Sequence, residues 1–372
     1  MYTLRALHRQ FHKDPRVSLH LVSPTNYFLF TPLLHEVATG ASTPESVVEP
    51  LRKIAGCCLQ DFHIASVLSV DLTARKLSLS DGSVVPYDSL VLAAGAATNF
   101  FDVPGAKEYA FPLKTLEEAR ALKNHILRIV ERAAALPLGS ERKRLLSFAI
   151  VGGGPTGVEF AAELAELCGE TFNKIYADKS YLADVSITIL ERGSDLLGKF
   201  TNDLRITAAR ALIKRGVTIR TGATVAAVTP EKVKLADGSE IETATVVWVV
   251  GVTPQPIETV PEVSRAKDSR IFVEDTLEVS GYPGVFVIGD LAAARNPKSE
   301  QLHPMLAQVA VKEAEIVALN VIRRIKSQPL RRFIFKSSGT LVSLGAWMAA
   351  GDIAGFTVSG KLMWWQAYRL SV

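Results

Sequence analysis

The stretch from Ser147 to Ala165 constrains the fold of this chain more than any other part of its sequence. It begins with a short apolar run, typical of a buried parallel strand, and ends with small apolar residues at helical spacing. Between these parts, Gly152, Gly154 and Gly157 form a G-x-G-x-x-G pattern. Glycines also mark ordinary turns, but between a strand and a helix they allow a tight bend, close approach of a pyrophosphate and close helix packing. The stretch therefore predicts a dinucleotide-binding turn.

The next predicted strand, Ser186–Leu190, is followed directly by Glu191. A carboxylate at this position can accept hydrogen bonds from a ribose 2′-hydroxyl and would repel a 2′-phosphate, which favours NADH over NADPH. Glu191 lies further from the glycine turn than the usual spacing of about 20 residues. We interpret Gly169–Leu182 as an insertion that lengthens the crossover. Because Arg192 lies beside this acid, NADPH stays the alternative nucleotide.

Two segments of the chain, Leu77–Gly95 and Val233–Gly251, align without a gap. Each contains Asp-Gly-Ser, beginning at Asp81 and Asp237, and then an apolar run that ends at a glycine. This pattern predicts a β-hairpin with an Asp-Gly turn, followed by a buried strand. Two copies indicate two nucleotide domains. A chance match between common hairpins is the alternative, but the order of the flanking segments favours a duplication.

The alignment also predicts where the chain enters its first nucleotide domain. The first copy of the glycine turn would fall just before Met1, so we expect the chain to begin inside that domain. Tyr2–Phe11 would be the helix after a missing strand and turn, and Val17–Val22 the second strand. Where an acid would meet a ribose, this copy has Ser23 and Pro24.

Composition is typical of a folded cytosolic protein. A length of 372 residues with 48% hydrophobic content suits two or three domains with well-formed cores. Cys57, Cys58 and Cys168 have neither C-x-x-C nor metal-ligand spacing, which favours a reducing compartment and predicts no metal site. We interpret the adjacent pair as buried small residues. No secretory signal is recognisable, and the longest uncharged late stretch, Ser337–Gly351, is shorter than the ~20 residues that a membrane span needs.

Positive charge gathers in the C-terminal part of the chain, from Ile316 onward, where Asp352 is the single acid. The basic residues there are Arg323, Arg324, Lys326, Arg331, Arg332, Lys336, Lys361 and Arg369. Aromatic residues accompany them, among them Trp347, Trp364, Trp365 and Tyr368. Cations beside aromatic rings suit an anionic lipid surface, while a solvated basic face over core aromatics is the alternative. Nucleic acid is disfavoured because no reader motif accompanies the charge.

These patterns predict an α/β fold with two Rossmann-like dinucleotide-binding domains, the first incomplete, and a membrane-facing C-terminal segment. We expect residues 1–112 to form the first part of one nucleotide domain and 113–252 to form the other. Residues 253–328 would return to the first domain, and 329–372 would begin a membrane-association region. The strand Gly284–Asp290 belongs to the return, and Asp290 could accept a hydrogen bond from a polyol hydroxyl.

Longer motifs in the chain resemble those of the type II, non-proton-pumping NADH:quinone dehydrogenases, which are flavoproteins with a glutathione-reductase-like fold. The resemblance covers nearly the full length and rests on Asn26–Leu34 with His35–Gly40, on Val151–Glu159, on Val287–Asp290 and on Ala307–Ala310. The first and last of these motifs distinguish the chain from general disulfide reductases. Those relatives, like sulfide:quinone reductases, need cysteines near the flavin, and none is suitably spaced here.

The resemblance implies FAD between the first domain and the Gly289–Asp290 segment, and NADH on the glycine turn. Hydride would pass from NADH to the flavin, and two electrons then to a quinone. It also implies a peripheral protein on the cytoplasmic side of the inner (cell) membrane and a possible homodimer. The residues expected to hold the two cofactors are Thr31, Pro32, Gly95, Gly152, Gly154, Pro155, Thr156, Gly157, Glu191, Gly251, Gly289, Asp290 and Ala307.

Glu159 and Gln308 are the candidate catalytic residues. We expect Glu159 in the first helical turn after Gly157, where the helix dipole favours a carboxylate by about 0.3–1 kcal/mol. That stabilising role is the alternative to a catalytic one. The resemblance implies that this acid approaches the flavin and nicotinamide, where it could organise the reduced complex or relay a proton to quinone. It implies that Gln308 lies on the quinone side.

The sequence departs from the family pattern in three ways. Lys312 stands where the family usually has glutamine, which would change the charge of the quinone pocket or weaken quinone binding. The first glycine fingerprint is absent, and the chain stops near Trp364–Leu370, where the family continues into amphipathic helices, so both ends look truncated. Two other functions stay open: a soluble NADH-dependent diaphorase or flavin reductase, and a non-catalytic NADH-binding remnant.

Overall fold

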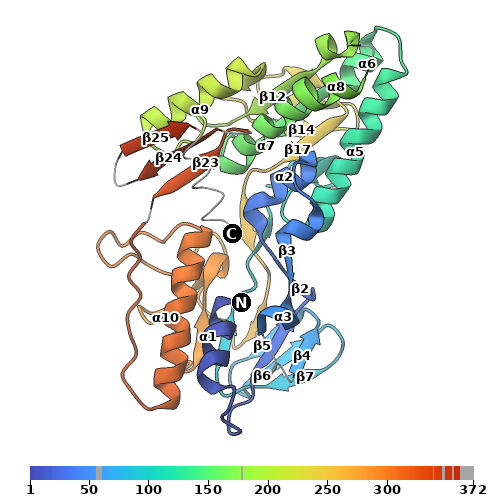
Figure 1. Cartoon of the computed structure of the whole chain (residues 1–372). Helices are drawn as coiled ribbons and strands as arrows, with labels where there is room; N and C mark the ends of the chain where they lie inside the picture. The colour runs from blue at the N-terminus through green and yellow to red at the C-terminus, as the bar shows by residue number, and fades with distance from the viewer. Residues whose placement is uncertain (56–60, 177–178, 338, 346–347, 354–355, 361–372) are drawn as a thin grey trace. The chain divides into compact units, whose positions relative to one another are not determined.

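The computed structural model describes residues 1–55, 61–176, 179–337, 339–345, 348–353 and 356–360. Its contacts divide the chain into two compact units (Figure 1). Unit 1 comprises Met1–Phe28, Val48–Ala97 and Val252–Ser337, and unit 2 comprises Leu29–Val47, Thr98–Gly251 and Ser338–Val372. The expectations for Cys57 and Cys58, and for Trp347, Trp364, Trp365 and Tyr368 in the tail, fall outside the described residues.

Unit 2 is built on a five-stranded parallel sheet. The strands, in spatial order, are β10 (Ala110–Pro112), β17 (Thr245–Trp248), β11 (Ser147–Val151), β12 (Ser186–Leu190) and β13 (Val217–Arg220). Every residue of β11 is buried, as expected for a parallel strand covered on both faces. The sheet confirms the strands predicted around the glycine turn and before Glu191.

Three long helices accompany this sheet: α5 (Leu116–Ala134), α7 (Pro155–Glu166) and α9 (Asn202–Lys214). A capping box starts α5, because the Thr115 side chain accepts from the Glu118 amide and the Glu118 carboxylate accepts from the Thr115 amide. Gly216, with φ +81°, follows the end of α9. The helix that the sequence predicts after the glycine turn is α7 and is therefore confirmed.

A small antiparallel sheet also belongs to unit 2, formed by β14 (Val225–Val228), β15 (Lys232–Leu235) and β16 (Glu240–Glu242). A further antiparallel sheet, formed by β23 (Thr340–Ser343), β24 (Ala349–Ile353) and β25 (Phe356–Gly360), contacts α7 and α9 (Figure 1). The 3-10 helix η1 (Thr31–Leu33) leads directly into α2 (Leu34–Thr39), which packs against α5 and α7.

Unit 1 is built around the strand β21 (Val285–Val287), which pairs in parallel with β8 (Leu90–Leu92). Alternate side chains of a strand point to opposite faces. Val285 and Val287 pack with the core of a four-stranded sheet, whereas Phe286 packs with α1 (Tyr2–Phe11) and α10 (Ala307–Ile325). The four-stranded sheet contains β19 (Glu258–Val260), β5 (Val67–Asp71), β6 (Lys76–Leu79) and β7 (Val84–Pro86).

The N-terminal helix has the predicted bounds, but the strand that follows it begins later than predicted. The strand β1 (His20–Ser23), paired in parallel with β4 (Asp61–Ile64), begins three residues later than the predicted start at Val17. Val17 belongs instead to a turn, since its amide donates to the carbonyl of Asp14. The apolar run alone could not separate this turn from the strand.

The two Asp-Gly hairpins adopt the same geometry in the two units, which confirms the repeat. In unit 1 the amide and hydroxyl of Ser83 donate to Asp81 Oδ1 at 2.9 and 2.6 Å. In unit 2 Ser239 makes the same two bonds to Asp237 Oδ1, also at 2.9 and 2.6 Å. The glycine between each pair has a φ of +83° or +86°, a conformation that other residues adopt at a cost.

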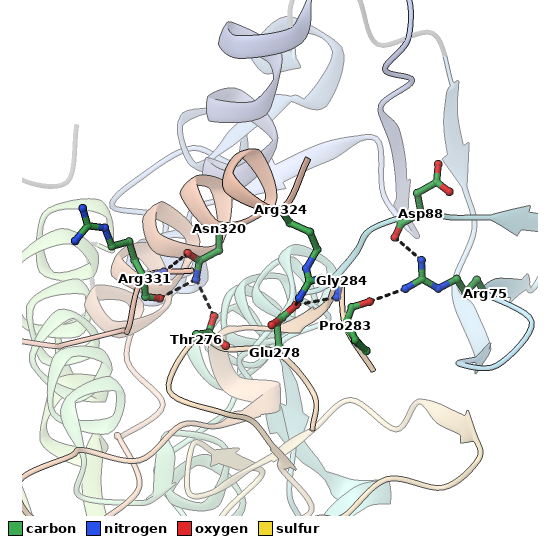
Figure 2. Close-up of polar contacts among 9 residues, drawn as sticks. All are labelled: Arg75, Asp88, Thr276, Glu278, Pro283, Gly284, Asn320, Arg324 and Arg331. Carbon is green, nitrogen blue, oxygen red and sulfur yellow. Dashed lines mark hydrogen bonds and ion pairs between the residues drawn. The ribbon is translucent and has the colours of Figure 1, made fainter. Parts of the chain in front are cut away.

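Helix α10 is anchored at its C-terminal half to the loop that precedes β21 (Figure 2). Asn320 is completely buried; its side chain donates to the carbonyls of Thr276 and Arg331 and accepts from the Arg331 amide. Arg324 pairs with Glu278, which also accepts from the Gly284 amide at 2.8 Å. Arg75 donates to the carbonyls of Asp88 and Pro283. The bonds of Asn320 and Arg324 hold α10 to the loop before β21, and those of Arg75 hold the same loop to Asp88.

The remaining elements are short. They are η2 (Pro44–Val47), α3 (Leu51–Ala55), α4 (Ala106–Tyr109), α6 (Ser140–Leu145), a π-helix (Leu167–Phe172), α8 (Asn173–Ile175), η5 (Ser180–Asp184), η6 (Gly289–Leu291), and the strands β2 (Tyr27–Leu29), β3 (Val48–Pro50), β9 (Ala96–Thr98), β18 (Val252–Pro254), β20 (Ile271–Phe272) and β22 (Ala292–Ala293). Among the described helices, none has the length and apolarity needed to cross a bilayer.

Candidate nucleotide-binding and acid–base site

The glycine turn of unit 2 has the geometry of a phosphate cradle. Gly152 has φ +118°, and a Cβ on Gly157 would lie 1.9 Å from the Gly152 carbonyl oxygen, so helix and strand approach as closely as glycine permits. A Cβ on Gly154 would meet no atom within 4 Å. The helix starts at Pro155 without a side-chain cap, which leaves the amides of its first turn for an anion. These residues fit the pyrophosphate of a dinucleotide.

Glu191 lies beside this turn despite the long crossover. Its two carboxylate oxygens accept from the amides of Gly153 and Gly193, at 2.7 and 2.6 Å. The long crossover contains the π-helix, α8 and η5, and β12 pairs with β11 along its whole length, so that β12 ends next to the turn. Arg192, because of which NADPH stays the alternative nucleotide, is exposed.

Glu159 lies deeper in α7 than the sequence suggests. The first turn of α7 contains no acidic residue, so the prediction that Glu159 sits there is wrong, and the helix dipole does not explain this acid. Its side chain is only 16% exposed. One carboxyl oxygen accepts from the Ser343 amide of β23 at 3.1 Å, and the other lies 3.8 Å from Nδ1 of His35 in α2.

Burial decides the charge of both groups in this contact. Desolvation raises the pKa of Glu159 to about 8, with Glu36 and Glu163 adding to the rise and the Ser343 amide opposing it. Desolvation lowers the pKa of His35 to about 4, against a backbone hydrogen bond with Pro32. At neutral pH the acid is therefore mostly protonated and the imidazole neutral. The contact between Glu159 and His35 is therefore one between two neutral groups and not a salt bridge.

Glu159 has two neighbouring carboxyl groups in unit 2, Glu36 and Glu163, and Glu166 in turn acts on Glu163. Burial raises the pKa of Glu163 to about 7, and Glu166 and Glu36 add to this shift, while Arg215 opposes it. Glu36 accepts from the Ser42 hydroxyl. We call Glu36, Glu159, Glu163 and Glu166 the acidic cluster. Groups with pKa values near neutrality can hold and transfer protons at physiological pH.

His35 and Glu163 have no catalytic or binding role among the residues predicted from the sequence. His35 lies in a motif that carries the family resemblance, and Glu163 follows Glu159 by one helical turn, a spacing that places both on one face of α7. These two signals could have suggested the cluster. No signal in the sequence indicates Ser343, which reaches Glu159 from a distant part of the chain.

Unit 1 contains the second group of predicted residues. Gly289, with φ +70°, and the half-buried Asp290 form η6 directly after β21. The Gly289 amide donates to the carboxylate of Glu313 in α10 at 2.5 Å. Ala307 and Gln308 are the first residues of α10 and are exposed. Lys312 is exposed as well and pairs with Glu315 at 2.9 Å on the same helix.

The predicted site residues thus form two groups, one in each unit. Unit 2 holds Thr31, Pro32, Gly152, Gly154, Pro155, Thr156, Gly157, Glu159, Glu191 and Gly251, and unit 1 holds Gly95, Gly289, Asp290, Ala307 and Gln308. Gly95 and Gly251 occupy matching positions after β8 and β17 and have similar φ values of +71° and +75°. Thr31 and Pro32 belong to the same unit as the glycine turn.

A strand, a glycine turn and a helix over a parallel sheet, with an acid at the end of the neighbouring strand, define a dinucleotide-binding α/β protein. The comparison with known families agrees with this class. Residues 4–314 match the model of the pyridine nucleotide-disulphide oxidoreductases, and the chain belongs to this family.

The curated relatives are more specific. The chain is 33% identical to the "Probable NADH dehydrogenase" of Dictyostelium discoideum, over 95% of this chain and 80% of the relative. It is 30% identical to the type II NADH:quinone oxidoreductase of Staphylococcus saprophyticus, over 97% of this chain and 89% of the relative. It also matches the external alternative NAD(P)H-ubiquinone oxidoreductase B4 of Arabidopsis thaliana, at 31% identity over 75% of this chain, but spans only about half (51%) of that protein.

Solved structures confirm the predicted fold class. The structure of NDH2 from Plasmodium falciparum in complex with NADH superposes with a TM-score of 0.89 at 22% identity, covering 100% of this chain and 92% of that one. The sulfide:quinone oxidoreductase of Aquifex aeolicus gives a TM-score of 0.76 at 19% identity, covering 100% and 86%. The chain therefore has the α/β fold of this flavoprotein family.

Proposed function

We propose that this protein is an NADH:quinone oxidoreductase, which moves a hydride from NADH to FAD and two electrons onward to a quinone. The observation that carries the proposal is Glu159, a buried acid that is mostly protonated at neutral pH and follows Gly157, the last of the dinucleotide-binding glycines, by two residues. The names of the curated relatives support the same reaction.

The residues of each unit would have distinct tasks. In unit 2, Gly152, Gly154 and Gly157 would hold the pyrophosphate of NADH, and Glu191 its ribose hydroxyls. In unit 1, Gly289 and Asp290 would hold the polyol of FAD. When bound, FAD supplies an acceptor for the hydride and a two-electron donor for the quinone. Gln308, exposed at the start of α10, would face the quinone.

Glu159 would supply a proton to the reduced quinone or organise the complex that precedes its reduction. His35 is neutral at neutral pH, so it does not form an ion pair that would stabilise the ionised form of Glu159. The acidic cluster could restore that proton, because Glu163 also has a pKa near neutrality.

The proposal extends to the location of the protein. We place it as a peripheral protein on the cytoplasmic side of the inner (cell) membrane. Contact with a membrane is supported by the end of α10, where Ile325 and Lys326 are both exposed. The homodimer remains a prediction.

The test measures flavin absorbance and asks which electron acceptors restore it after reduction by NADH. The purified chain, supplied with FAD, should show flavin absorbance that NADH bleaches without oxygen and that a short-chain quinone restores. Absence of flavin absorbance, or of bleaching, would contradict the proposal and favour a non-catalytic NADH-binding protein. Restoration by soluble dyes but not by quinones would instead favour a diaphorase.

Glu191 should determine nucleotide preference. Glu191→Ala removes the partner for the ribose 2′-hydroxyl and loosens the turn, because the amides of Gly153 and Gly193 lose their acceptor. We expect NADH to bind roughly 10- to 100-fold more weakly, by about 1.4–3 kcal/mol, and the preference for NADH over NADPH to shrink. Fluorescence titration with both nucleotides measures this.

The matched control is Asp195→Ala, which removes an exposed carboxylate of the loop after Glu191 that pairs with Arg205 of α9. This variant should bind both nucleotides like the wild type. If Glu191→Ala keeps the full affinity and preference, Glu191 does not contact the ribose.

A further inference from the structure

Glu313 is a buried acid that the proposed reaction does not use. Glu313 is only 1% exposed and lies on the buried face of α10. Gln308 and Lys312 lie on the exposed face of the same helix. An uncompensated charge at such a position is costly, so a carboxyl group there needs a specific structural reason.

The hydrogen bond of Glu313 supplies that reason. Its Oε2 accepts from the Gly289 amide at 2.5 Å, at the start of η6. Gly289 has a positive φ, so the chain turns sharply between β21 and η6. The far half of α10 is bound to the loop before β21 through Asn320 and Arg324 (Figure 2). Glu313 therefore fixes the other end of the same strand.

The groups around Glu313 do not offset the cost of burying its charge. Desolvation raises the pKa of Glu313 most, the Gly289 amide lowers it, Asp290 from η6 raises it as a like charge, and Arg270 from the segment before β20 lowers it. Arg270 is already engaged by Asp268 and by the carbonyl of His303. On α10 itself, Lys312 pairs with Glu315.

From the α1 side the polar groups near α10 are few. Thr3 donates its hydroxyl to the carbonyl of Ala314, and burial lowers the pKa of the Met1 amino group. Desolvation dominates the outcome and raises the pKa of Glu313 to about 8.

We propose that Glu313 is a positioning residue, which as a neutral acid holds the Gly289–Asp290 turn in the shape that receives FAD, and that ionisation of Glu313 weakens FAD binding. The inference rests on the proposed function, because it takes FAD as the occupant of this turn. Asp290 would accept hydrogen bonds from the polyol of FAD, and a second carboxylate charge beside it repels Asp290 and the negatively charged cofactor as a whole.

The affinity for FAD depends on pH because FAD and the proton of Glu313 favour each other's binding. FAD binds best to the protonated form of Glu313 and therefore raises its pKa. The affinity is full below a pH of about 8 and falls as the pH rises through the value for free protein. Each unit by which FAD raises the pKa of Glu313 corresponds to a roughly tenfold loss of affinity at high pH.

The experiment is a titration of the apoprotein with FAD, followed by flavin fluorescence, at several values from about pH 7 to about pH 9.5. The wild type should bind FAD about 3- to 10-fold more weakly at the upper end. Glu313→Gln, whose amide oxygen still accepts from Gly289 but which has no proton to lose, should bind FAD with no such dependence. Glu313→Ala should bind weakly at every pH, because the Gly289 amide loses its acceptor.

Glu315→Gln is the matched control, since Glu315 is an exposed acid two positions further on the same helix, and it should keep the wild-type slope. A wild-type affinity that does not change with pH, or a Glu313→Gln variant that keeps the wild-type slope, overturns the inference while leaving the proposed function intact. A wild type that binds no FAD at any pH contradicts the proposed function itself.

Infrared spectroscopy tests the same point in case Glu313→Gln does not fold. Glu159→Gln and Glu163→Gln together remove the other two buried acids with raised pKa values in the described part of the chain, so that the remaining carbonyl band of a buried protonated carboxyl belongs to Glu313. This band should be lost as the pH rises, and FAD should shift that loss to higher pH. A band that FAD leaves unaffected overturns the inference.

Discussion

Replacing Gly157 with alanine should destabilise unit 2 by about 3 kcal/mol or more and abolish measurable NADH binding. The added Cβ would lie 1.9 Å from the Gly152 carbonyl oxygen, a backbone atom that cannot move without displacing the strand–helix turn. Gly154→Ala provides a sharp contrast. Its Cβ meets no atom within 4 Å and its φ of −75° is ordinary, so stability should change by less than about 0.5 kcal/mol.

The two variants separate the fold from the ligand. In Gly154→Ala the methyl group would fill the space that a pyrophosphate needs, so NADH affinity should fall at least about tenfold while the unfolding temperature stays the same. Thermal unfolding and NADH titration measure the two effects. A Gly157→Ala protein with wild-type stability, or a Gly154→Ala protein with wild-type NADH affinity, would show that the glycine turn does not work as we describe.

Replacing Glu159 with glutamine should stabilise the protein and slow it as a catalyst. In the folded state the pKa of Glu159 is raised to about 8 from the ordinary 4.5, so between these values folding must take up a proton and stability falls as the pH rises. Glutamine removes this penalty. We expect a gain on the order of 2 kcal/mol at pH 7 to 8, and none below the ordinary pKa, where both states are protonated.

The same substitution should slow quinone reduction by about 10- to 100-fold while NADH still binds, because the proton of Glu159 is gone. Denaturant unfolding across pH and steady-state kinetics with quinone are the two measurements. Glu170→Gln, an exposed acid beyond the end of α7, should change neither. Stability gained without loss of turnover would remove Glu159 from the mechanism and leave it as a buried residue of the fold.

Much of the fold could be predicted from the sequence because its signals are local. The strand Ser147–Val151, the three glycines and the helix that follows are adjacent in the chain, and each has a pattern of its own. The Asp-Gly hairpins were also predictable, since a turn of this kind requires a glycine with positive φ.

The site was less predictable because its chemistry depends on contacts between distant segments. Glu159 differs from an exposed helical acid through burial under α2 and β23, and the Ser343 amide reaches it from nearly two hundred residues away. Glu313 likewise looks like one acid among several on α10, until the turn at Gly289 supplies its donor. Neither pKa shift can be derived from sequence, because desolvation causes both.

The return of the chain to unit 1 affects the order in which the protein can be made. The strand Leu90–Leu92 emerges from the ribosome long before Val285–Val287, its parallel partner. At about 5–20 residues per second, the delay is roughly 10–40 s. The sheet of unit 2 can meanwhile close, because its strands lie between Ala110 and Trp248. During synthesis the strand Leu90–Leu92 therefore waits without its parallel partner, and its unpaired edge is a site that a chaperone could protect.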